Sequence, residues 1–291
     1  MRIGIHTSTA GALVNAANKA LELGANCFQI FSASPRQWRA TPPDPAQVAA
    51  MKAKRAECDL TPLVIHDSYL INLAASDEEI RAKSIAAFRG ELERAVTIGA
   101  EYLVMHPGSA KGYENPEDAF GVLAKSLEAA AKGIRGKGFT LLFENTAGGG
   151  STLGRSFDEL KTLRALAGPR LPFPTGFCLD TCHLFVSGYD VSTKKGLDET
   201  VRQAAGLLGL ENIPVIHAND SKGALHSKLD RHENIGAGHI GLEGFRRILN
   251  HPQLLDKAFV LETPIDNEGD DQRNVDTLKS LCRKPRTTTN K

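Results

Sequence analysis

Residues 176–185 read G-F-C-L-D-T-C-H-L-F and place two potential metal ligands just past an apolar run. Residues 177–179 are compact and apolar, which favours a short buried strand. Asp180 comes where that strand would end, and His183 follows three residues later on an expected connecting loop. Because functional side chains concentrate on the loops of a rigid scaffold, the stretch predicts a metal site at the edge of a sheet.

The same pattern recurs along the whole chain. Eight short apolar runs typical of buried strands occupy residues 2–6, 27–31, 62–66, 101–106, 140–144, 176–180, 213–217 and 258–262. Their last residues are His6, Phe31, His66, His106, Glu144, Asp180, His217 and Glu262. All of these except Phe31 have side chains that can bind a metal ion.

Helical patterns separate these runs. We expect helices over residues 12–23, 45–57, 77–98, 116 to about 133, 157–166, 196–208, 242–249 and 272–282. Asp44, Ser76 and Asn115 are the expected N-caps of three of them, and Ser156 with Glu159 forms a capping box for a fourth.

Alternating strands and helices predict a parallel sheet, and eight such units predict one closed (β/α)₈ TIM barrel over residues 1–283. Its active site is expected at the C-terminal face of the strands. The polar tail, residues 284–291, is expected to be disordered. An open doubly wound sheet is the alternative fold, but no Gly-x-Gly-x-x-Gly motif follows the first strand.

The composition is that of an ordinary soluble protein. The chain has 291 residues, of which 41% are hydrophobic and 24% are charged, and its formal net charge is +1. No global positive field therefore points to nucleic acid, although local phosphate contacts are still possible. The five scattered cysteines fit reduced thiols. With no signal peptide or membrane-spanning run, we expect a cytoplasmic protein without a membrane partner.

Gathering carboxylates and imidazoles at one barrel mouth without cations would desolvate like charges together, at several kcal/mol per ion. We therefore expect divalent metals. His183, Asp230 and His232 extend the set, because the segment 218–241 is long for a loop in a compact barrel. Residues two apart in an extended segment point the same way, so Asp230 and His232 could bind one ion together with His183. Mixed imidazole and carboxylate ligands favour zinc, with manganese or iron possible.

Seven ordered motifs that span nearly the whole chain resemble the endonuclease IV family of abasic-site endonucleases. They are H-D-S-Y-L-I-N-L-A (66–74), H-P-G-S (106–109), E-N-T-A-G (144–148), L-D-T-C-H (179–183), H-A-N-D-S-K (217–222), D-R-H-E-N-I-G (230–236) and L-E-T (261–263). The resemblance implies a TIM barrel with three zinc ions. It also implies hydrolysis of the phosphodiester 5′ to an abasic site, giving a 3′-hydroxyl and a 5′-deoxyribose phosphate, together with trimming of blocked 3′ ends.

The resemblance also assigns the metal ligands. It implies that His66 and His106 bind one zinc ion and that Glu144 bridges this ion to the next. The second ion would be completed by Asp180, His217 and Glu262, and the third would be bound by His183, Asp230 and His232. Glu144 is thereby the expected catalytic residue. His6 has no ligand counterpart, so we expect a supporting or structural role for it.

The implied partner is double-stranded DNA that contains abasic sites or blocked 3′ ends, and a monomer is sufficient. Arg36, Tyr69 and Leu70 resemble the residues of the family's intercalating loops, whereas Trp38 could equally pack against the barrel. Residues 32–35, S-A-S-P, depart from the family pattern, in which a basic residue and an asparagine are usual. We therefore expect weaker phosphate binding by that loop.

Two other functions compete with the nuclease. A single-metal sugar isomerase or epimerase on the same barrel would use only Glu144, Asp180, His217 and Glu262, and it has no use for five further ligands. A lesion-binding barrel without catalysis is the third interpretation, and the full ligand set argues against it.

Overall fold

Eight parallel strands form a closed barrel in the computed structural model, which describes residues 1–136 and 138–283. The barrel strands are β1 (Arg2–His6), β2 (Cys27–Phe31), β3 (Leu63–His66), β4 (Tyr102–Met105), β5 (Thr140–Glu144), β6 (Thr175–Asp180), β7 (Val215–His217) and β10 (Ala258–Leu261). Each strand pairs with its neighbours along the chain, and β1 closes the circle on β10. The predicted barrel is confirmed, and the eight strands lie within two residues of the predicted runs.

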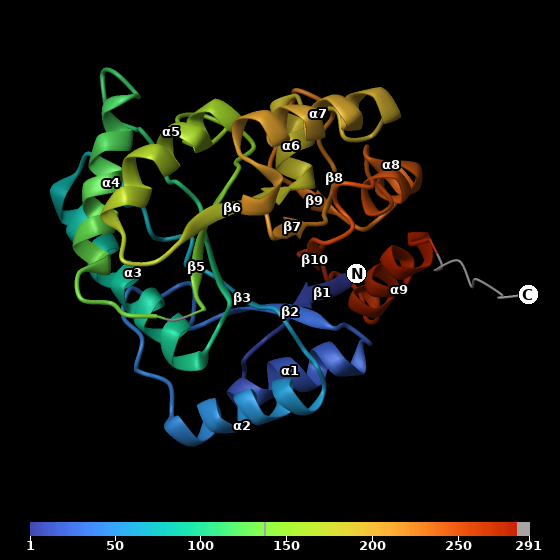
Figure 1. The fold of residues 1–291 in the computed structure, drawn as a ribbon, viewed down its shortest axis with the longest axis horizontal. Helices are drawn as coiled ribbons and strands as arrows, with labels where there is room; N and C mark the ends of the chain where they lie inside the picture. The colour runs from blue at the N-terminus through green and yellow to red at the C-terminus, as the bar shows by residue number, and fades with distance from the viewer. Residues whose placement is uncertain (137, 284–291) are drawn as a thin grey trace, which may run out of the picture.

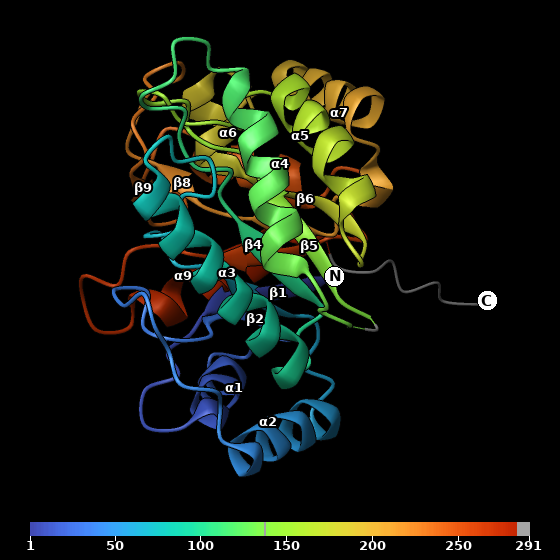
Figure 2. The ribbon, with the colours of Figure 1, turned by 90° about the vertical axis from the view of Figure 1, so that its left-hand side faces the viewer.

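The helices surround the strands, as Figure 1 shows. They are α1 (Leu13–Glu22), α2 (Pro45–Glu57), α3 (Glu78–Ile98), α4 (Asp118–Ala131), α5 (Phe157–Ala167), α6 (Thr181–Ser187), α7 (Lys194–Leu207), α8 (Gly241–Leu249) and α9 (Asp270–Leu281), with two 3₁₀ turns at Gly168–Arg170 and Leu210–Asn212. A small antiparallel pair, β8 (Asp220–Ser221) with β9 (His232–Glu233), lies outside the barrel. In Figure 2 this pair lies on the left-hand side of the molecule, opposite the N-terminus.

Two predicted N-caps and one predicted loop differ from the structure. Asp77, and not Ser76, caps α3, because its carboxylate accepts the backbone N–H groups of Glu79 and Ile80. The Asn115 side chain accepts the N–H of Glu117 in a turn, and α4 begins only at Asp118. The segment after β6 was expected to be a loop but forms α6, which Asp180 caps and Gly188 ends with a positive φ of 116°.

Alternation along the strands separates two cores. The larger core lies between the barrel and its helices, and it includes Phe28, Phe88 and Phe143. A smaller apolar layer fills the barrel itself: Cys27, Val64, Val104, Leu142, Cys178, Val215, Ala258 and Val260. Because side chains two apart on a strand point the same way, the residues that follow this layer by two positions also point inward, at the C-terminal rim.

No helix within the described residues is both long enough and apolar enough to cross a membrane. All five cysteines are free. The expected disordered tail, residues 284–291, lies outside the described residues.

Candidate metal centre

The potential ligands from the strand ends meet at one rim of the barrel. His66, Glu144, Asp180 and His217 are the last residues of β3, β5, β6 and β7. His106 and Glu262 come directly after β4 and β10. Each of these six follows a residue of the inner apolar layer by two positions, so the strand pleat turns them all into the barrel mouth.

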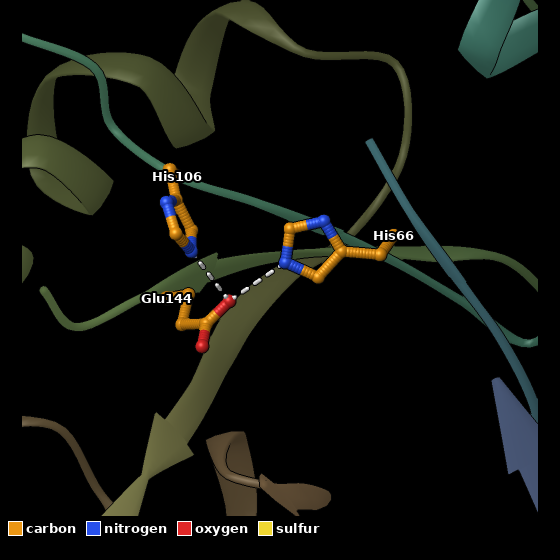
Figure 3. A group of neighbouring side chains, drawn as sticks. All are labelled: His66, His106 and Glu144. Atoms are coloured by element: carbon orange, nitrogen blue, oxygen red, sulfur yellow. Dashed lines mark hydrogen bonds and ion pairs between the residues drawn. The ribbon is translucent and has the colours of Figure 1, made fainter. Parts of the chain in front are cut away.

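The first cluster contains His66, His106 and Glu144. The Nε2 atoms of the two imidazoles lie 3.0 Å and 3.2 Å from the same carboxylate oxygen, Oε2 of Glu144. Figure 3 shows both rings pointing at that oxygen from two separate segments of the chain. Glu144 is completely buried, while the side chain of His106 is 38% exposed and forms the open edge of the cluster.

The second cluster contains Glu144 again, with Asp180, His217 and Glu262. Nδ1 of His217 lies 2.9 Å from Oε1 of Glu144 and 3.2 Å from Oε2 of Glu262. The two oxygens of Glu144 therefore face different clusters. Three carboxylates here share one imidazole in a desolvated place, an arrangement that a bound cation would stabilise.

The third cluster contains His183, Asp230 and His232. Nε2 of His183 lies 3.1 Å from Oδ1 of Asp230, and Nε2 of His232 lies 3.8 Å from the same oxygen. Nε2 of His232 is a buried nitrogen that has no hydrogen-bond partner among the residues that the structure describes. Buried polar atoms are rarely left unpaired, so this nitrogen fits a ligand of an ion.

Two local structures bring the third cluster together. Asp180 Oδ1 accepts the backbone N–H of His183 at 2.7 Å, so a member of the second cluster also caps the helix that carries His183. His232 lies on β9, which pairs with β8. The fully buried carboxylate of Asp220, on β8, accepts the backbone N–H groups of Gly236, Gly238, Ile240 and Gly241 and so fixes the segment after β9.

The outer nitrogens of the imidazoles are also fixed. Nδ1 of His66, His183 and His232 lies 2.9 Å, 2.9 Å and 3.1 Å from the backbone carbonyl oxygens of Asp67, Asn145 and Glu262, respectively. A carbonyl can only accept, so each Nδ1 carries a proton and Nε2 is left to face its cluster. Such outer contacts are usual for histidines that bind metal.

Side-chain amides behind the ligands were not predicted from the sequence. Asn219 Nδ2 donates to Asp180 Oδ2 at 2.6 Å, and its Oδ1 accepts the N–H of Glu262 at 2.8 Å. Asn145 accepts the N–H of Asp180 at 2.7 Å. Gln29 contacts both His217 and Glu262. In the sequence, these three amides stood out only as polar residues beside or within apolar strands.

Imidazoles and carboxylates stabilise one another's charged forms in the clusters. Burial opposes the charge on His66 and His183, but the hydrogen bond and charge of Glu144 raise the pKa of His66 to about 9, and Asp180 and Asp230 raise that of His183 to about 10. Partial desolvation likewise opposes ionisation of Glu262 and Asp230, yet the histidines lower the pKa of each to about 2. Burial lowers the pKa of His6 to about 4, so this ring is neutral.

The predicted DNA-binding residues lie on two neighbouring loops at the same rim. Arg36 is exposed on the loop after β2, and on the loop after β3 Tyr69 is 61% exposed and Leu70 is half-buried. Ser68 Oγ donates to the carbonyl of Pro35 at 2.8 Å and joins the loops. Trp38 is 37% exposed, so its side chain is only partly buried.

Ser32, the first residue of the departure from the family pattern, anchors its loop to α3. Its hydroxyl contacts the carboxylate of Glu91 and accepts from Nε of Arg94 at 2.6 Å. Glu91 and Arg94 form a buried ion pair at 2.9 Å. This serine therefore has a structural role in holding the loop.

A barrel with ligand-type side chains clustered at its C-terminal rim defines a class of metal-site TIM barrels. The family model for the xylose isomerase-like TIM barrel matches residues 17–283. A D-tagatose 3-epimerase-like protein superposes with a TM-score of 0.66 at 19% sequence identity, covering 97% of both chains. At that identity the likeness shows the fold alone.

Two closer relatives define the family. A protein of Solibacter usitatus named probable endonuclease 4 is 54% identical over 97% of this chain and 97% of its own length. The crystal structure of endonuclease IV from Thermus thermophilus superposes with a TM-score of 0.85 at 39% identity, covering 97% of this chain and 98% of that one. The chain belongs to the endonuclease IV family, and it is a nuclease.

Proposed function

We propose that this protein is a DNA-repair endonuclease that hydrolyses the phosphodiester 5′ to an abasic site, leaving a 3′-hydroxyl and a 5′-deoxyribose phosphate. Nine side chains in three clusters, two of which share Glu144, are the observation that supports this proposal most strongly. Trimming of blocked 3′ ends belongs to the same proposal, because it breaks the same kind of bond next to a 3′ oxygen.

The residues fit three zinc ions, with manganese or iron possible at some positions. His66, His106 and Glu144 would hold one ion; Glu144, Asp180, His217 and Glu262 a second; and His183, Asp230 and His232 a third. The buried, unpartnered Nε2 of His232 and the three desolvated carboxylates of the second cluster support these assignments. When bound, the ions would supply water activation near neutral pH and neutralisation of phosphate charge.

The chain's own groups would position the substrate. Side-chain exposure is 38% at His106 and 52% at Asp230 but at most 19% at the other members, so a phosphate can reach the clusters between these two residues. Cys178 and Cys182, the thiols beside the second and third clusters, are not suited to act as the nucleophile, because burial raises the pKa of each to about 12. Glu144 would be catalytic because it belongs to two clusters at once.

Arg36, Tyr69 and Leu70 would enter the DNA beside the lesion. A duplex that lacks one base bends and extrudes nucleotides more easily than an intact duplex, which would open the backbone to a barrel mouth. Because the net charge is only +1, phosphate attraction would come from the metal site and local basic groups. A monomer would be sufficient for this activity.

Two measurements on one preparation test the proposal. The protein is equilibrated with zinc and dialysed, its bound metal is counted, and it is then incubated with a duplex that contains one tetrahydrofuran site. About three ions per chain and incision on the 5′ side of the lesion are expected. One ion per chain with no incision would instead favour the isomerase or epimerase.

A further inference from the structure

Gln29 is a fully buried amide that belongs to none of the three clusters. It interrupts the apolar strand C-F-Q-I-F and points into the barrel, two residues after Cys27 of the inner layer. A buried amide has four hydrogen-bonding positions to satisfy, and leaving any of them unpaired destabilises the fold. The partners of Gln29 are therefore informative.

The contacts determine which way the amide faces. Nε2 lies 2.5 Å from Oε1 of Glu262, whose carboxylate can only accept, and 3.1 Å from Nδ1 of His6. The amide nitrogen must therefore be on that side. Oε1 of Gln29 then faces Nε2 of His217 at 2.9 Å and must accept from it.

This orientation fixes the tautomer of His217. A proton on Nε2 leaves Nδ1 to face Oε1 of Glu144 and Oε2 of Glu262, in the second cluster. His66, His183 and His232 are held by backbone carbonyls, which no substitution removes. The outer nitrogen of His217 instead contacts a side chain.

We propose that Gln29 is a positioning residue for the second metal ion, because one amide orients the imidazole of His217 and the carboxylate of Glu262 together. His6 supports Gln29 by accepting its second amide hydrogen, which gives a role to a strand-end histidine outside the ligand set. The inference rests on the proposed metal centre. It adds a residue that touches neither the metal ions nor the substrate.

The test compares Gln29→Met with Cys27→Ala. Methionine keeps most of the volume of glutamine but neither donates to Glu262 nor accepts from His217 with comparable strength. Cys27 lies on the same inward face of β2, and its replacement loosens the barrel interior without touching a ligand. Each protein is dialysed against a series of buffered free-zinc concentrations, and the bound ions are counted.

Loss of an outer-sphere hydrogen bond typically weakens metal binding about 10- to 100-fold. Q29M should therefore lose one zinc ion at a free-zinc concentration that is 10- to 100-fold higher than the concentration at which wild type loses it. Its other ions should be retained. C27A should bind zinc like wild type, even if its melting temperature falls as far as that of Q29M. The inference is overturned if Q29M retains every ion at wild-type concentrations, or if C27A loses the same ion. A wild-type protein that binds no zinc would overturn the proposed metal centre itself, so the two failures are distinguishable.

Discussion

Glu144 is the residue on which the clusters depend most. Its oxygens face different groups: Oε2 lies near His66 and His106, and Oε1 lies near His217. The carboxylate is fully buried, and burial opposes its charge, but His217 and His106 hold its pKa well below the usual range. Glu144 therefore carries a charge in a desolvated place, where a charge acts strongly on its neighbours.

Glu144→Gln should abolish incision while the fold remains intact. Glutamine has the same shape but no charge, and it presents one donor where both clusters have an acceptor. We expect the single-turnover rate on a tetrahydrofuran duplex to fall by roughly 10³-fold or more. Glu243→Gln, on the exposed face of α8, should retain full activity. Substantial turnover by E144Q in the presence of its metals would remove the bridging role.

Replacing Tyr69 and Leu70 together with Ala should weaken incision far more than stability. Tyr69 is 61% exposed, so little packing is lost in the free protein. Stacking between a base and an aromatic ring contributes about 1–3 kcal/mol, so kcat/KM should fall roughly 10- to 100-fold. The control is Leu166→Ala, which truncates an apolar side chain that is 41% exposed on α5. An unchanged rate at subsaturating DNA would exclude a role for these residues as a wedge.

At the scale of elements, local signals predicted most of the fold. The caps at Asp44 and Ser156 are confirmed, because Asp44 accepts the N–H groups of Ala46 and Gln47 and Ser156 accepts that of Glu159. The predicted box is not closed, because the carboxylate of Glu159 accepts from Gly154 and Arg155 instead of Ser156. The cap at Ser76 was wrong for a non-local reason: its hydroxyl donates to the carbonyl of Lys111, which leaves the cap position to Asp77. The helix α6 was not predicted, because its seven residues are too few to show a helical period of apolar residues.

The carboxylate of Asp220, on β8, fixes the segment that follows β9. Asp220→Ala should leave several buried N–H groups between Gly236 and Gly241 without an acceptor, which lowers the free energy of unfolding by about 3 kcal/mol. Because the same segment follows His232, zinc should be lost first from the third cluster. Denaturant unfolding and metal counting measure the two effects.

Asp190→Ala is the matched control for Asp220→Ala. Asp190 also accepts backbone N–H groups, those of Ser192 and Thr193, but it belongs to none of the three clusters. D190A should lower stability modestly and leave zinc binding unchanged. If D220A kept all its zinc, the third cluster would not need this carboxylate to fix the segment after β9.

At the scale of the whole molecule, the sequence predicted which ligand residues come together but not the hydrogen bonds that position them. The strand-end pattern located the rim, because parallel strands in a barrel end on one face. The supporting contacts join residues far apart in sequence: Gln29 meets His217, and Asn219 meets Glu262. The first pair meets across the closed barrel, and the second joins the ends of the neighbouring strands β7 and β10, so no local pattern encodes either one.

The assembled rim predicts how the protein responds to metal and pH together. Without metal, the charged imidazoles of His66 and His183 stabilise the carboxylates. Their pKa values of about 9 and about 10 exceed the ordinary 6.5, so this stabilisation is complete below pH 6.5 and is lost as pH rises through 9 to 10. Metal binding requires the same imidazoles to lose their protons, so zinc should release protons and bind more tightly as pH rises.

Two measurements follow. The melting temperature of chelator-treated protein should fall between pH 7 and pH 9.5, while that of zinc-loaded protein should change less, so the gap between them widens. Calorimetric titration of zinc in buffers of different ionisation enthalpy should give a positive proton release at pH 7.5. Raised pKa values of buried thiols would destabilise both forms alike at high pH, so only the gap between the forms isolates the histidines. If the difference in melting temperature between the two forms narrowed as pH rises, the charged histidines would not be stabilising the carboxylates in the absence of metal.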